Sequence, residues 1–242
     1  VEPLIHAKEK GSKVAAITNV LGSTIYRMGD YKLLLGAGPE KAVASTKATT
    51  SQLAVIMLLA FACSGKFRDG EKILIDLIGK VNDMLNPRYG EHIRSIAGKI
   101  YHNKNIFIIG RGINYPIALE SAIKVMEVSY IHAQGFAGGD LKHGPIALVE
   151  KGTPVIALVS DDTKNEILSN AMEVKSRGAL VIGVSPENNE VFDYWIRTPK
   201  VFESVSSITN LIPIQLLAYY LGLLNGRDID KPRNLAKSVT VK

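Results

Sequence analysis

Four residues in the middle of the chain are of types that could move protons. Glu120, Lys124 and Glu127 stand at i, i+4 and i+7, so a helix would place two carboxylates and an ammonium group along one ridge. His143 follows in a segment rich in glycine, 138–145, which is too flexible to pack as part of a core. A histidine in such a segment serves a site more often than a core, and histidine is a common acid–base residue, so we expect it to serve a site. A solvated row of ion pairs is the alternative interpretation of the ridge.

The surrounding segment, 105–145, predicts a strand, a turn and a helix that position these side chains. An apolar run at 106–109 ends in a turn with Gly110 and Gly112, and Asn114 can cap the helix that follows. The apolar face of this helix has helical spacing and consists of Ile117, Ala118, Ser121, Ala122, Val125 and Val128. The two glycines alone indicate a dinucleotide site only weakly, because that motif needs a third glycine and an acidic residue about 20 positions later.

The composition is that of a globular protein with one large or two small domains, since 46% of the 242 residues are hydrophobic and 21% are charged. The longest apolar run, 53–63, is too short to span a bilayer, and the first residues lack the apolar core of a signal peptide, so we expect no membrane association. The single cysteine, Cys63, excludes a disulfide within the chain and favours a cytoplasmic location. The net charge of +6 is scattered, which argues against nucleic acid and leaves a small phosphorylated ligand as the anionic partner.

Two parts of the chain repeat one pattern. A helix end and a glycine precede apolar strands at 14–17 and at 180–184. An Asp-Tyr pair follows each strand, at 30–31 and at 193–194, and a glutamine on a later helix lies 22 residues after each aspartate. The repeat predicts two copies of one α/β unit, each with a parallel sheet covered by helices, in which the two apolar segments are equivalent central strands.

The repeat also predicts the domain organisation. We expect the C-terminal part of a first unit at 1–69, a helical connection at 70–101, and a second unit with a C-terminal tail at 102–242. About 65 residues precede the repeated pattern in the second unit and only six precede it in the first. The first unit is therefore expected to be truncated at its N-terminus, and the chain to be part of a longer protein.

Four motifs in a fixed order carry a resemblance to a known enzyme family. They are VASTKA at 43–48, the helix at 119–132, LKHGP at 141–145 and the tail PRNLAKSVTV at 232–241. Over essentially all 242 residues the sequence resembles the sugar-isomerase half of the glucosamine-6-phosphate synthases, or glutamine:fructose-6-phosphate amidotransferases. The resemblance implies two tandem sugar-isomerase (SIS) domains, each a flavodoxin-like three-layer αβα sandwich with a parallel sheet.

The resemblance also implies an activity. Family members convert fructose 6-phosphate and glutamine-derived ammonia to glucosamine 6-phosphate in amino-sugar synthesis, usually as homodimers and without a metal or organic cofactor. The expected ligands are therefore fructose 6-phosphate, glucosamine 6-phosphate and glucose 6-phosphate. The family's phosphate loop and its glutaminase domain would both lie before Val1 and are not part of this sequence.

Seven positions match functional residues of the family. The resemblance implies a proton-shuttling glutamate at Glu127, an assisting lysine at Lys124, a ring-opening histidine at His143 and an iminium-forming lysine at Lys237. It places the family's sugar contacts at three further positions: Val43, Ser45 and Ala236. No metal ligand is implied. The family also implies that His143 completes a site on a neighbouring subunit.

Other functions stay open at this stage. One is a non-catalytic sugar-phosphate-binding SIS regulator, which the loss of Glu127 or Lys237 would have favoured. Another is a different aldose-ketose sugar-phosphate isomerase or deglycase, from which only the tail at 232–241 separates this sequence. A dinucleotide-binding domain is disfavoured by the glycine spacing described above.

Overall fold

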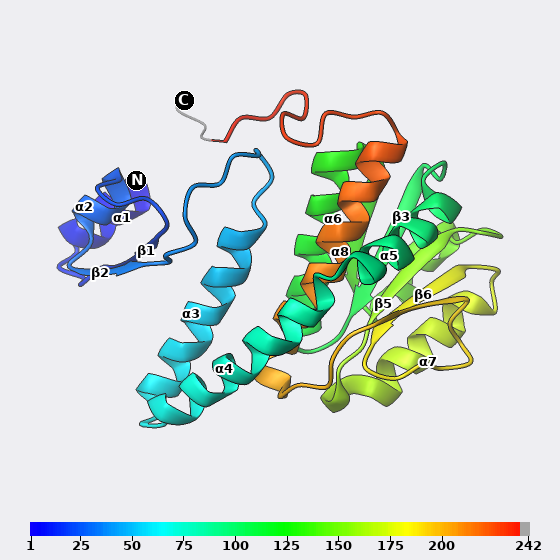
Figure 1. Cartoon of the computed structure of the whole chain (residues 1–242), viewed down its shortest axis with the longest axis horizontal. Helices are drawn as coiled ribbons and strands as arrows, with labels where there is room; N and C mark the ends of the chain where they lie inside the picture. Colours follow the sequence, from blue (N-terminus) through cyan, green and yellow to red (C-terminus); the bar gives the residue numbers. More distant parts are fainter. Residues whose placement is uncertain (238–242) are drawn as a thin grey trace.

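Two parallel β-sheets with helices around them make up the fold in the computed structural model, which describes residues 1–237 (Figure 1). The end of the tail motif, 238–241, lies outside the described residues. The elements follow one another in the order α1 (Glu2–Glu9), β1 (Ala15–Thr18), α2 (Thr24–Met28), β2 (Tyr31–Leu34), α3 (Lys47–Cys63), α4 (Phe67–Met84), α5 (Pro87–Ile100), β3 (Asn105–Gly110), α6 (Asn114–Ser129), β4 (His132–Ala137), η1 (Leu141–His143), η2 (Pro145–Leu148), β5 (Pro154–Leu158), η3 (Asp161–Thr163), α7 (Lys164–Lys175), β6 (Leu180–Ser185), β7 (Tyr194–Arg197) and α8 (Glu203–Leu224).

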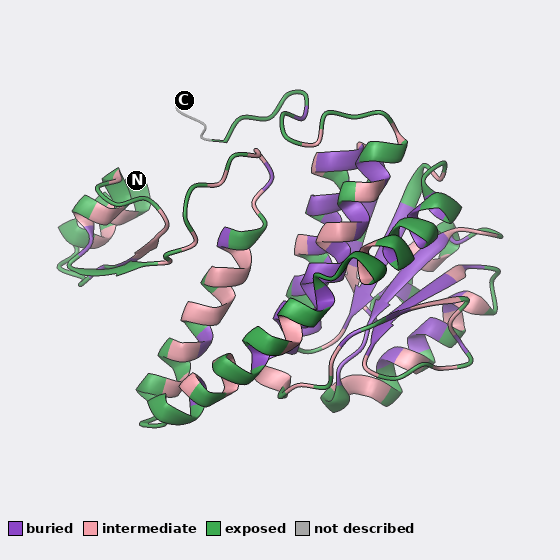
Figure 2. Cartoon of the chain, in the orientation of Figure 1, coloured by how far each residue is buried: buried purple, intermediate pink, exposed green. Residues whose placement is uncertain are grey.

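The larger sheet has five strands in the order β4-β3-β5-β6-β7, and every neighbouring pair is parallel. Its central strands are buried because helices cover both faces of the sheet (Figure 2). On β3, Ile106 and Ile108 belong to a core with α5, α6 and α8, whereas Phe107 and Ile109 belong to a second core with α7. The sheet and the helices on its two faces form three layers, which confirms the predicted α/β class.

Helix α8 is the long apolar element of the larger core. It is long and apolar enough to cross a membrane by length and composition, but 67% of its apolar window is buried within the protein. It packs against α5 and α6, with Leu211, Ile214 and Leu217 fully buried in the core that also holds the inward face of β3. Its apolar sequence is therefore that of a core helix.

The internal repeat is visible in matching contacts of the two units. In the first unit, the Asp30 carboxylate accepts a hydrogen bond from the Val14 amide at 2.8 Å and pairs with a lysine of α1. In the second unit, Asp193 accepts a bond from the Val181 amide at 2.7 Å and pairs with a lysine of α7. The parallel pairs β1-β2 and β6-β7 are therefore equivalent. The prediction of a central strand is right for β6 and wrong for β1, which within the described chain pairs with β2 alone.

The predicted helical connection at 70–101 is formed by most of α4 and by α5. The break between them follows from Asn86, whose side chain accepts a bond from the Tyr89 amide at 3.0 Å, and from Pro87 in the first turn of α5. Helix α5 packs on α8 and contributes Ile93 and Ile100 to the core of the larger sheet. Where the domain boundaries lie stays a prediction.

The expected role of Asn114 as a helix cap is wrong. Helix α6 has Ile113 at its N-cap position, and Asn114 is already its first residue. The Asn114 side chain is fully buried, donates to the Ser160 hydroxyl at 2.8 Å and accepts from the Asn210 amide at 3.0 Å. Tertiary partners on β5's C-terminal side and on α8 thus take the side chain that would otherwise satisfy the start of the helix.

Candidate active site

The charged ridge of α6 is not a solvated row of ion pairs. The Lys124 side chain is only 5% exposed, and its ammonium group lies 2.7 Å from a Glu127 oxygen and 3.4 Å from a Glu120 oxygen. About a quarter of each carboxylate side chain remains exposed, 26% for Glu127 and 27% for Glu120. The buried lysine pairs with both carboxylates and fixes their orientation, which leaves Glu127 directed and partly accessible.

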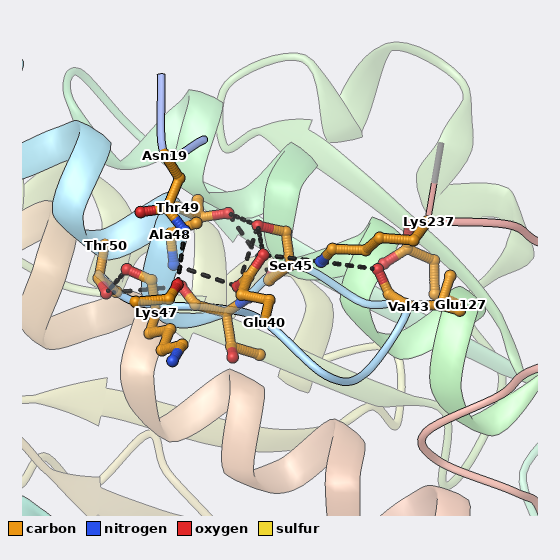
Figure 3. A network of polar contacts seen from close by, with 12 residues as sticks. Asn19, Glu40, Val43, Ser45, Lys47, Ala48, Thr49, Thr50, Glu127 and Lys237 are labelled. Carbon is orange, nitrogen blue, oxygen red and sulfur yellow. Dashed lines mark hydrogen bonds and ion pairs between the residues drawn. The ribbon is translucent and has the colours of Figure 1, made fainter. Parts of the chain in front are cut away.

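Lys237 of the tail reaches into the loop that precedes α3 (Figure 3). Its ammonium group donates to an oxygen of Glu40 at 2.7 Å and to the carbonyl oxygen of Val43 at 3.3 Å. The Lys237 side chain is 42% exposed, whereas the Glu40 side chain is only 9% exposed. These two bonds therefore hold the tail against this loop, although the two segments are far apart in the sequence.

Glu40 also organises the start of α3. One of its carboxylate oxygens accepts bonds from the backbone amides of Thr46 at 2.9 Å and Ala48 at 3.2 Å. The Ser45 hydroxyl lies 3.4 Å and 3.3 Å from the two oxygens and accepts a bond from the Thr49 hydroxyl at 3.0 Å. Amides at a helix N-terminus favour a negative charge. The carboxylate thus satisfies free helix donors and orients the Ser45 hydroxyl at the same time.

The tail is also anchored at its beginning, on the C-terminal end of α6. Tyr130 ends this helix in a left-handed conformation with φ of 62°, and its hydroxyl accepts a bond from the Arg233 amide at 2.7 Å. The guanidinium groups of Arg233 and Arg227 lie over the Tyr130 ring, 4.6 and 5.1 Å from its centre. The tail residues 233–235 line a pocket of about 390 Å³ together with Glu127. The tail therefore runs from the Glu127 end of α6 to the loop of Glu40.

The remaining predicted residues, Ala236 and His143, have fewer contacts with the rest of the candidate site in the described chain. Ala236 is exposed beside Lys237 in the tail. His143 ends η1 with an exposed side chain, and its amide donates to the Asp140 carbonyl at 3.0 Å. Among residues 1–237, no hydrogen bond or ion pair joins the His143 side chain to Glu127 or Lys237. The same described part of the chain has no cluster of three or more His, Cys, Asp or Glu residues able to hold a metal ion.

Comparison with known families gives a match to the SIS domain over residues 1–62 and 99–224. The chain belongs to the SIS domain family. Membership of this family agrees with the sheet covered by helices on both faces. It also agrees with the repeat of the β1-β2 and β6-β7 contacts, since the match has one part in each unit.

Individual members of the family are similar to this chain over almost all of its length. The glutamine–fructose-6-phosphate aminotransferase (isomerizing) of Pyrococcus horikoshii is 43% identical, with 98% of this chain and 40% of that protein aligned. The enzyme of the same name from Bacillus licheniformis is 46% identical over 99% of this chain and 41% of its own. The chain thus spans about two fifths of the length of these relatives.

A solved SIS structure shows the same similarity in three dimensions. The C-terminal domain of glucosamine-fructose-6-phosphate aminotransferase from Francisella tularensis superposes with a TM-score of 0.86 and 31% identity, covering 96% of this chain and 68% of that one. The sequence resemblance to the isomerase half of these synthases is therefore confirmed at the level of the fold and of the family.

The sequence analysis missed Glu40, which has more partners than any of the seven expected SIS site residues has in the described chain. A signal for it was present in the repeat. Glu40 lies ten residues after Asp30, and Glu203 lies ten residues after Asp193, so both units carry a glutamate at one equivalent position. Both glutamates lie between the Asp-Tyr pair and the glutamine that mark the repeat in each unit.

The charge of Glu40 predicts a dependence of stability on pH. Burial alone would raise the pKa of Glu40, but the bonds from Lys237 and from the Thr46 and Ala48 amides outweigh it and hold the pKa below its ordinary value of 4.5. Because the pKa is lowered on folding, the carboxylate stabilises the fold above pH 4.5, and this stabilisation is lost as the pH falls through the folded-state pKa.

We therefore expect the difference in stability between the wild-type protein and Glu40→Gln to shrink on acidification. Urea unfolding at pH 7 and at pH 3.5 measures it, as the change in the unfolding free energy of each protein between the two conditions. The wild type should lose more stability than the variant. Equal losses in the two proteins would show that the folded and unfolded states hold the Glu40 proton equally well.

Proposed function

We propose that this chain is the sugar-isomerase half of an aminotransferase that converts fructose 6-phosphate and glutamine-derived ammonia to glucosamine 6-phosphate. The observation that carries this proposal is the position of the Lys237 amine, which lies between the Glu40 carboxylate and the Val43 carbonyl with Ser45 beside it. A lysine amine brought from the far end of the chain into a polar loop is suited to condense with a ketone. The named relatives at 43% and 46% identity support the choice of reaction.

In this proposal Lys237 supplies the nucleophile. Its neutral amine adds to the C2 carbonyl carbon of the open-chain ketose, and the former carbonyl oxygen leaves as water, which yields an iminium. The iminium withdraws electrons and acidifies the hydrogens on C1. Ammonia then adds at C2 and the lysine nitrogen leaves, so that the amine of Lys237 is regenerated and the sugar carries the new nitrogen. The Val43 carbonyl, the Ser45 hydroxyl and the Ala236 backbone hold the sugar at this position.

Glu127 carries the proton in the isomerisation. Its carboxylate removes a proton from C1 to give an enaminol and returns the proton to C2, while the C1 hydroxyl loses its proton and becomes the aldehyde. One carboxylate suffices if it lies over both carbons. Lys124, buried at 2.7 Å from Glu127, fixes the orientation of the carboxylate that accepts the proton.

His143 is assigned the opening of the sugar ring in a neighbouring subunit of a homodimer. The supporting observations are its exposed side chain on η1 and its lack of a contact with Glu127 or Lys237 among the described residues. An imidazole exchanges a proton with the ring oxygen near neutral pH. The assembled protein is proposed to be cytoplasmic, with a glutaminase domain upstream that releases the ammonia.

A subunit-complementation experiment tests the assignment of His143. Chains with Glu127→Gln and with His143→Ala are each expected to be inactive as homodimers, but a mixed dimer contains one site with both residues intact. Random association of equal amounts should restore about a quarter of the wild-type activity, because about half of the dimers are mixed and each has one working site. If mixing restores nothing although mixed dimers form, the site is built within one chain.

The proposed reaction itself is tested by product detection. The intact protein, incubated with fructose 6-phosphate and glutamine, should release glucosamine 6-phosphate, which mass spectrometry separates from the ketose and from glucose 6-phosphate. Release of glucose 6-phosphate alone would identify an aldose-ketose isomerase without amino transfer. Release of ammonia from glucosamine 6-phosphate without the forward reaction would identify a deglycase, and binding of sugar phosphate without any turnover would identify a regulator.

A further inference from the structure

Glu40 is the one residue in the described chain that contacts both the reacting lysine and the start of α3. Its two oxygens accept bonds from the Lys237 ammonium group at 2.7 Å and from the Thr46 and Ala48 amides at 2.9 and 3.2 Å. With the Ser45 hydroxyl also within 3.4 Å, the carboxylate has four different donors and is only 9% exposed. A carboxylate fixed by this many bonds has little freedom to move, so any side chain that it binds is held in one place.

The repeat offers a comparison, because the equivalent glutamate of the second unit binds a hydroxyl group instead of a lysine. Glu203, the equivalent glutamate of the second unit, is the first residue of α8 and accepts a bond from the Ser160 hydroxyl at 2.7 Å. Glu203 is in the first turn of α8, whereas Glu40 lies in the loop before α3 and reaches the amides at the start of that helix with its carboxylate, where a negative charge is favourable. The Ser160 donor to Glu203 comes from its own unit, whereas one of the four donors to Glu40 is Lys237 from the C-terminal tail. In the first unit, the carboxylate at the start of the helix also binds the C-terminal tail through Lys237.

We propose that Glu40 is the positioning residue for Lys237, and that it holds the amine beside the Val43 carbonyl before the sugar arrives. The proposal rests on the proposed function, since it assigns a task to a residue of the same site. Glu40 therefore sets the place of the nucleophile.

Glu40→Gln tests the proposal, with Glu203→Gln as the matched control at the equivalent position of the second unit. Glutamine keeps the size of the side chain and an oxygen that accepts from the Thr46 and Ala48 amides, so the start of α3 is retained. The negative charge that binds Lys237 is lost. Circular dichroism and thermal melting confirm that both variants of the intact protein are folded before the measurements are compared.

The first measurement follows Lys237 without any substrate. Limited acetylation by acetic anhydride, followed by peptide mass spectrometry, reports how readily the Lys237 amine reacts when it is bound to Glu40 and when it is not. Glu40→Gln should raise the acetylation rate of Lys237 about tenfold at a given pH, because the amine is no longer held against a carboxylate by a charge-assisted hydrogen bond. Glu203→Gln should leave the rate at the wild-type value. An unchanged rate in Glu40→Gln would overturn the proposal.

The second measurement is turnover of fructose 6-phosphate. Glu40→Gln should lower kcat about 10²-fold, as expected for a nucleophile displaced by roughly an ångström, while Glu203→Gln should stay within about twofold of the wild type. A kcat close to that of the wild type in Glu40→Gln would contradict the positioning role. If instead the wild-type protein makes no glucosamine 6-phosphate, the proposed function fails, and the acetylation rates still decide whether Glu40 holds Lys237.

Discussion

Replacing Lys237 with arginine is expected to abolish the covalent adduct that borohydride traps between the protein and fructose 6-phosphate. Arginine keeps the positive charge that binds Glu40, so the tail should remain in place. The guanidinium group stays protonated, however, and cannot attack the ketone. Turnover should fall to the background rate. Peptide mass spectrometry after borohydride reduction measures the adduct and locates it in the sequence.

The location of the adduct is the decisive part of this experiment. Lys124 is the other lysine of the site, but its side chain is 5% exposed and is paired with two carboxylates, whereas Lys237 is 42% exposed. The adduct of the wild-type protein should therefore map to Lys237 alone. An adduct on Lys124, or an adduct that persists in Lys237→Arg, would mean that the nucleophile has been assigned to the wrong residue.

Glu127→Gln is expected to stop the exchange of substrate hydrogen with solvent deuterium. The amide has the shape of the carboxylate and can still accept a bond from Lys124, but it cannot take a proton from carbon. Removal of a positioned general base costs about 10² to 10⁴-fold in rate, or about 3 to 5 kcal/mol of barrier. Mass spectrometry of fructose 6-phosphate recovered from D₂O measures the exchange.

Two comparisons separate loss of the base from damage to the site. The borohydride adduct on Lys237 should still form in Glu127→Gln, because iminium formation does not use Glu127. Glu120→Gln changes the other carboxylate of the same ridge, which lies 3.4 Å from Lys124, and should cost far less exchange. Wild-type exchange in Glu127→Gln would remove this residue from the role of the base.

The fold was predictable where the physical signal is local. The apolar run and the glycines at 105–112 predicted β3 and its turn, and the matched Asp-Tyr pairs predicted two related units, because strands, stops and helices leave periodic patterns. The apolar face of α6 was predicted for the same reason. Patterns of this kind depend only on residues that are near one another in the sequence.

The parts of the site that depend on tertiary partners were not predictable in the same way. The burial of Lys124 follows from the packing of α6 and could not be read from a charged ridge that surface helices also show. Asn114 satisfies the capping rule in sequence, but partners at Ser160 and Asn210 take its side chain. The bond between Glu40 and Lys237 joins residues that no local pattern relates. The family resemblance identified Lys237, whereas its partner Glu40 was identified only from the structure.

The contact between Glu40 and Lys237 also bears on the order in which the protein folds. It closes a loop of 197 residues, and the chain entropy lost on closing a loop rises with its length. Helices and the neighbouring strands of the larger sheet form over much shorter separations and so can form first. The Lys237 amine therefore reaches Glu40 only after both units and the tail have folded. Partly folded chains whose sheets have already formed would therefore have a Lys237 amine that is not yet positioned by Glu40.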